Sequence, residues 1–175
     1  MKFNAVMNIL LTASNMLVSI VTIPYVTRVL SVEGYGDVTF AQNVSQWLSA
    51  MCLVGVPMYG LRECARVRDD PREMARVVRE LLAIITIFTA VVLTCFGVSI
   101  LVVPRFHQIA ALMWVFLVST LLLSYGVEWY FQAIEQYKYI TIRSMVFKML
   151  SLVAMLVFVR DEGDYLAYGV ILALV

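Results

Sequence analysis

The sequence contains few residues of the kinds that build catalytic or metal centres. Its 175 residues include one histidine, His107, and three widely spaced cysteines, Cys52, Cys64 and Cys95. An odd number of cysteines at such distances fits neither a disulfide framework nor a metal-ligand cluster. The chain also has no HExxH motif, no P-loop and no nucleophile placed close to a base. These absences disfavour an enzyme, a metalloprotein and a protein with a resident cofactor.

Charged residues are also scarce. They make up 14% of the chain, whereas 62% of the residues are hydrophobic, and the formal net charge is only +1. A nearly neutral chain lacks the excess of cations with which proteins bind nucleic acid. The composition instead predicts an all-α polytopic membrane protein.

Long apolar runs divide the chain into membrane spans. About 20 apolar residues cross the roughly 30 Å hydrocarbon core of a bilayer. The sequence predicts five complete spans and part of a sixth within one bundle of residues 1–175, at 4–30, 37–61, 81–103, 108–134, 140–159 and 166–175. The short last run indicates a fragment of a longer protein or a truncated product.

One polar segment fixes the predicted orientation. Arg62–Glu80 has eleven charged side chains in nineteen residues, including six of the thirteen Lys and Arg residues. Basic loops stay in the cytoplasm, so this segment and the N-terminus are predicted to be cytoplasmic. Within it, Asp70–Glu73 has the pattern of a helix N-cap followed by Pro and Glu, which predicts an amphipathic helix along the membrane surface. Its arginines either anchor the topology or attract an anionic lipid head group.

Polar side chains form stripes on the first two spans. They recur at helical spacing, so each set shares one face: Asn4, Asn8, Thr12, Asn15, Ser19 and Thr22 in the first span, and Thr39, Gln42, Gln46 and Ser49 in the second. Such faces cannot point at lipid, so they contact other helices or line an aqueous cavity. The two hairpin arms also place Arg28 opposite Asp37. Pro24 and Pro57 predict kinks.

Two ionisable residues lie deeper in the predicted spans. Glu128 and Lys148 are equally far from a turn centred on Lys138, so the two can form an ion pair. An intramembrane charge is costly and suggests a function. A structural ion pair, or a lysine that snorkels to the interface, is the alternative.

Several stretches resemble one known family. They are PYVTRVLSVEGYG at 24–36, GLRE at 60–63, GVEWYFQ at 126–132, YKYI at 137–140, and the region from Arg143 through Lys148 to Arg160. Together they resemble bacterial polysaccharide or O-antigen flippases of the multidrug/oligosaccharidyl-lipid/polysaccharide (MOP) superfamily. Family members have about twelve to fourteen spans in two bundles, so the resemblance covers most of the first bundle.

The resemblance implies export of undecaprenyl-diphosphate-linked sugar repeat units across the bacterial inner membrane by alternating access. It implies that Arg28, Arg143 and Lys148 hold the diphosphate, with Asn15 and Gln46 as further cavity residues. Glu128 would be the coupling acid for a proton or Na⁺ gradient. Lipid-linked oligosaccharide and membrane lipids would be the ligands, and a polysaccharide polymerase and glycosyltransferases the partners in the pathway. A drug or metabolite exporter of the same superfamily, or an inactive truncated fragment, remain as alternatives.

Overall fold

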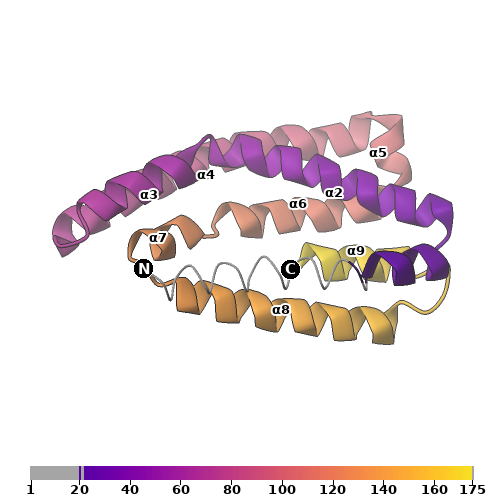
Figure 1. Cartoon of the computed structure of the whole chain (residues 1–175). Helices are drawn as coiled ribbons and strands as arrows, with labels where there is room; N and C mark the ends of the chain where they lie inside the picture. Colours follow the sequence, from indigo (N-terminus) through magenta and orange to yellow (C-terminus); the bar gives the residue numbers. More distant parts are fainter. Residues whose placement is uncertain (1–19, 21, 175) are drawn as a thin grey trace.

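The described part of the protein is built from helices. The computed structural model describes residue 20 and residues 22–174, and it contains no strand among them. Most of the predicted span at 4–30, including Asn15, lies outside the described residues. A helix over 22–29 is followed by α2 (Val32–Leu53), α3 (Val56–Arg66), α4 (Pro71–Val102), α5 (Pro104–Gln108), α6 (Ala110–Ser124), α7 (Glu128–Ala133), α8 (Tyr137–Phe158) and α9 (Tyr165–Ala173) (Figure 1).

The second predicted span is bent. Its two halves, α2 and α3, meet at an angle of 43°. Val54 and Gly55 between them have left-handed backbones, with φ of 42° and 75°. Pro57 lies in the first turn of α3, where a missing N–H costs nothing. The kink predicted from Pro57 is confirmed, and it lies at the two residues before α3.

The charged segment leads into one long helix. The Asp70 carboxylate accepts hydrogen bonds from the backbone N–H groups of Arg72 and Glu73, at 2.9 and 3.3 Å, so the predicted N-cap is confirmed. From Pro71 the helix α4 continues for 32 residues without a break, which corresponds to roughly 48 Å. The amphipathic first turns and the apolar run at 81–103 thus form a single rod.

The fourth predicted span is also interrupted. Helix α6 ends at Ser124, and α7 begins only at Glu128. A Cβ on Gly126 would lie 2.9 Å from the carbonyl oxygen of Leu123, so the break requires a glycine there. The chain then reverses at Glu135, whose φ is 59°, and returns as α8.

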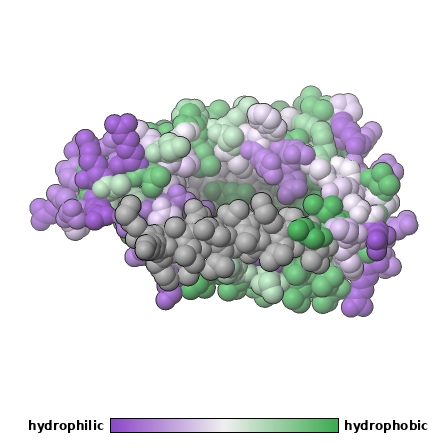
Figure 2. Space-filling view, in the orientation of Figure 1, coloured by the Kyte–Doolittle hydropathy of each residue, from purple (hydrophilic) through white to green (hydrophobic). Residues whose placement is uncertain are grey.

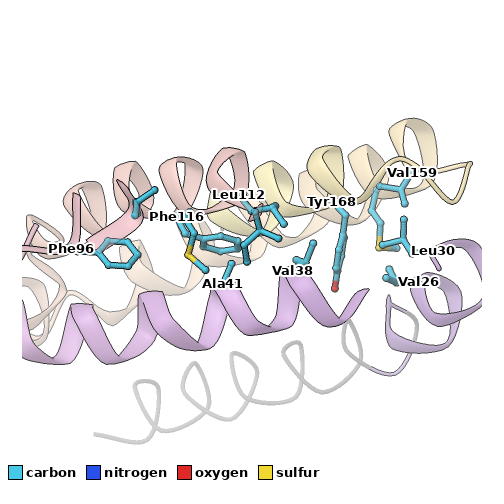
Figure 3. Packing of buried hydrophobic residues seen from close by; sticks show 13 residues of the cluster. Val26, Leu30, Val38, Ala41, Phe96, Leu112, Phe116, Val159 and Tyr168 are labelled. Atoms are coloured by element: carbon cyan, nitrogen blue, oxygen red, sulfur yellow. The ribbon is translucent and has the colours of Figure 1, made fainter. Parts of the chain in front are cut away.

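Two clusters of buried residues hold the helices together. The larger one joins residues of the 22–30 segment, α2, α4, α6, α8 and α9, with Val38, Leu112 and Phe116 among its members (Figure 3). The second lies at the other end of α4, where Trp129 of α7 packs against α3 and α4. A Cβ on Gly60 would lie 2.7 Å from the Trp129 ring, so α3 needs a glycine at this contact.

The surface has the polarity of a membrane protein. Hydrophilic residues gather at the two ends of the molecule, with hydrophobic residues over much of the middle (Figure 2). Large apolar side chains such as Ile87, Leu122 and Leu150 are at least 60% exposed. In the described part of the chain, three helical stretches are long and apolar enough to cross a bilayer, and the bent α2–α3 pair would be a fourth. The predicted all-α polytopic membrane fold is confirmed.

Candidate functional site

The predicted cavity residues are distributed over several elements. Arg28 and Gln46 are exposed, on the 22–29 helix and on α2. Glu128 is the first residue of α7, and Arg143 and Lys148 are partly exposed on α8. The described residues contain no group of three or more His, Cys, Asp or Glu side chains that could hold a metal ion.

Glu128 forms an ion pair with Arg143. Nη2 of Arg143 donates a hydrogen bond to Oε1 of Glu128. The Arg143 side chain is 37% exposed and the Glu128 side chain 46% exposed. The predicted pairing of Glu128 with Lys148 is therefore wrong. The reason is the position of the turn, which is centred on Glu135 rather than on Lys138. Glu128 lies seven residues before Glu135 and Arg143 eight residues after it, so these two are at matching depth.

Lys148 lies on a different side of α8. It follows Arg143 by five residues, which turns its side chain about 140° around the helix axis. It forms no salt bridge with any other described residue, and its backbone carbonyl accepts a hydrogen bond of 2.8 Å from the Ser151 hydroxyl. The Glu128 carboxylate, which pairs with Arg143, nevertheless also interacts electrostatically with Lys148, so one carboxylate lies within range of both α8 cations.

Arg28 lies near the opposite end of α8. Tyr25, in the same short helix, donates its hydroxyl hydrogen to the carbonyl oxygen of Val159 at 2.9 Å. Arg143 is sixteen residues before Val159, a distance of roughly 24 Å along a helix axis. The structure therefore does not bring Arg28 beside Arg143.

Asp37 has a different partner from the one expected. Its carboxylate accepts a hydrogen bond of 2.6 Å from Arg105 in α5, and Asp37 is 15% exposed. The expected position of Arg28 opposite Asp37 does not lead to an ion pair. The sequence does not identify Arg105 as the partner of Asp37, because the geometry of the hairpin formed by the first two spans does not determine how α5 packs against α2.

A buried polar contact joins α2 and α6. Ser45 and Thr120 share a hydrogen bond of 2.8 Å between their hydroxyl groups, and both are buried. Ser45 lies outside the predicted polar stripe of the second span, and the stripe residue Gln46 is exposed. On α2, the contact to another helix and the exposed polar face are thus formed by different residues.

These features define an all-α polytopic membrane protein with charged residues in its membrane helices. The family model for "Polysaccharide biosynthesis protein" matches residues 2–175, and the chain belongs to this family.

The chain is similar to two curated proteins, both named "Putative O-antigen transporter". One, from Shigella dysenteriae, is 26% identical over 171 residues, which cover 95% of this chain and 42% of the relative. The other, from Escherichia coli strain K12, is 22% identical over 174 residues, which cover 98% of this chain and 41% of the relative. The chain thus spans about two fifths of the length of the curated relatives it matches. No solved structure matches it.

Proposed function

We propose that these residues form the N-terminal part of a flippase for polysaccharide or O-antigen biosynthesis. The flippase moves undecaprenyl-diphosphate-linked oligosaccharide repeat units across the bacterial inner membrane by alternating access, and it is a transporter rather than an enzyme. Family membership and the names of the two relatives support this proposal. The N-terminus and Arg62–Glu80 lie in the cytoplasm, as the distribution of Lys and Arg predicts.

The observation that carries the proposal is the cationic character of α8. Arg143 lies about 9 Å along the axis from the start of this helix, and Lys148 lies deeper. Both side chains are partly exposed. Such charges within a span are costly and belong to substrate or ion pathways. A diphosphate is a dianionic ligand that accepts strong hydrogen bonds from Arg and Lys. A drug exporter would instead present acidic side chains to cationic drugs.

The remaining predicted residues have supporting roles in this proposal. Arg28 meets the substrate near the outer end, after the diphosphate leaves Arg143 and Lys148. Gln46 and Asn15 contribute uncharged hydrogen-bonding groups to the cavity. Glu128 neutralises Arg143 when no substrate is bound, and it takes up a proton or a Na⁺ ion when the diphosphate displaces it. The flipped repeat units then serve the polymerase of the pathway, and glycosyltransferases supply them.

Genetic complementation tests the function. The full-length gene product that carries this chain is expressed in a strain that lacks its own flippase, and surface polysaccharide is measured. We expect the wild type to restore the polysaccharide, Lys148→Met to abolish it at normal protein abundance, and Lys148→Arg to retain part of it. Failure of the wild type in strains with several different repeat units would contradict the proposal. So would full activity of Lys148→Met.

A further inference from the structure

An open groove runs beside the first turns of α8. Its volume is about 730 Å³, and its wall consists of the turn before α8 together with Lys138, Tyr139, Ile142, Arg143, Val146 and Phe147. Helix α8 lies at the edge of the described bundle, with α7 beside its first turn (Figure 1). Four of the groove residues, Tyr139, Ile142, Val146 and Phe147, are about half exposed. The groove therefore opens to the surroundings of the protein.

The groove changes from polar to apolar along the helix. Lys138 lies at its polar end, in the first turn of α8, and Ile142 and Val146 follow one and two turns deeper. The Tyr139 ring packs on Phe131 with centroids 4.8 Å apart. Tyrosines of this kind are typical of the membrane–water interface. The polar end consequently lies at head-group level, and the apolar residues lie at the depth of hydrocarbon chains.

The charges of the groove leave one cation uncompensated. Arg143 is paired with Glu128, and Glu135 in the preceding turn is paired with Arg68 at 3.3 Å. Lys138 forms no salt bridge with any residue in the described part of the chain. The first turn of α8 also has no side-chain cap for its backbone N–H groups, so the positive end of the helix dipole adds to the attraction for an anion. One net positive charge matches one phosphodiester group better than a diphosphate.

We propose that this groove binds an anionic phospholipid of the membrane. The phosphate accepts hydrogen bonds from the Lys138 ammonium group at the first turn of α8. One acyl chain lies along Ile142, Val146 and Phe147. The lipid contacts differ from those of the transport cycle proposed above, because they use Lys138 rather than Lys148, and because Glu128 holds the Arg143 guanidinium of the groove wall when no substrate is bound.

Native mass spectrometry of the purified full-length gene product that carries this chain tests the lipid site. The protein is titrated with phosphatidylglycerol, and in parallel with phosphatidylcholine of the same acyl chains and with a polyprenyl diphosphate. We expect phosphatidylglycerol to bind most tightly, and Lys138→Gln to weaken it about fivefold, the effect of one basic residue near an anionic lipid surface. Arg79→Gln is the matched control, because it removes one positive charge at the same end of the molecule outside the groove.

A second pair of variants tests the apolar half. Val146→Trp fills the groove and should lower phosphatidylglycerol binding, whereas Val153→Trp, at an exposed position further along α8, should not. Equal binding of the two phospholipids, or equal losses in Lys138→Gln and Arg79→Gln, would refute the site. A polyprenyl diphosphate that binds more tightly than phosphatidylglycerol and depends on Lys138 would also overturn the assignment to a phospholipid. Neither result affects the complementation test of transport.

Discussion

The carboxylate of Glu128, at the start of α7, holds the guanidinium of Arg143 on α8. This contact ties together the two arms of the hairpin that reverses at Glu135. A second ion pair, between Arg68 and Glu135, joins the turn itself to the segment between α3 and α4. The first ion pair thus joins the two arms of the hairpin, and the second attaches the hairpin to the charged end of the molecule.

The pair also determines which charges on α8 are available to a ligand. Arg143 has an internal anion as partner, whereas Lys148 has no salt-bridge partner among the described residues. An anionic substrate would have to displace Glu128 to reach Arg143, but it could approach Lys148 directly. The two cations should therefore respond differently to substitution.

The contact between Gly60 and Trp129 leads to a stability prediction. We expect Gly60→Ala to be less stable than Gly36→Ala by about 1–3 kcal/mol, the usual cost of overpacking a well-filled site. Both changes add the same helix propensity, but a Cβ at position 36 meets nothing within 4 Å. Thermal unfolding in detergent measures the difference. Equal transition temperatures would show that the Trp129 ring can move aside.

The loop before α9 leads to a prediction about pH. Oδ2 of Asp164 accepts hydrogen bonds from the backbone N–H groups of Arg160 and Asp161, both at 3.0 Å. These bonds lower the pKa of the Asp164 carboxyl below its ordinary value. Because the pKa is lowered in the folded state, the hydrogen bonds stabilise the loop fully at pH values above the unfolded-state pKa of about 3.9. This stabilisation is lost as the pH falls through the folded-state pKa.

Hydrogen exchange at the amides of residues 160 and 161 checks this prediction. After correction for the intrinsic rates, we expect protection at pH 7 that persists to about pH 4 and disappears under more acidic conditions. Asp164→Asn should lose most of the protection at pH 7. Asp161→Asn is the control, because the Asp161 side chain accepts no hydrogen bond from the described residues. Unchanged protection in Asp164→Asn would contradict the proposed role of the carboxylate.

The orientation is tested by labelling single cysteines from outside the cell. In a background without Cys52, Cys64 and Cys95, we expect Asp69→Cys to react with an impermeant maleimide only after the membrane is opened. Gly163→Cys should react in intact cells. Asp69 is fully exposed and Gly163 is exposed, so access to either position depends on the side of the membrane. The reverse labelling pattern would invert the topology.

Much of the fold could be predicted because its signals are local. The N-cap at Asp70 depends on neighbouring residues alone, and the bend at Val54 and Gly55 has a local signal in the nearby Pro57. The interruption of the fourth span has a local signal too, in Gly126, but a single glycine inside an apolar run is compatible with an unbroken helix. The break becomes visible only when the backbone around Leu123 is known.

The partners of the charged residues could not be predicted with the same success. A shift of three residues in the centre of the turn, from Lys138 to Glu135, exchanges Lys148 for Arg143 as the partner of Glu128. The contact of Asp37 with Arg105 depends on how α5 packs against α2. The geometry of a single hairpin does not determine that packing. Side-chain pairs that join distant segments require the tertiary arrangement.

The last prediction separates a structural role of Arg143 from a role in substrate binding. In the full-length protein, Arg143→Met should lower export about 10- to 100-fold, the loss expected for a hydrogen bond to a charged group. It also leaves Glu128 without its partner, so the single variant combines both effects. Glu128→Leu alone should keep Arg143 available to the diphosphate but remove the group proposed to couple transport to an ion gradient.

The double variant, Arg143→Met with Glu128→Leu, distinguishes the two roles. Replacing both members of an ion pair with apolar residues is often tolerated by the fold, because neither charge is left unpaired. Its abundance and transition temperature should therefore return toward the wild type, while export falls below that of Glu128→Leu alone, because the double variant also lacks the Arg143 cation. Export is measured as surface polysaccharide, and abundance by immunoblot of the membrane fraction. Recovery of export together with stability would show that Arg143 only holds the α7–α8 hairpin, and Lys148 would then be the remaining α8 cation for the diphosphate.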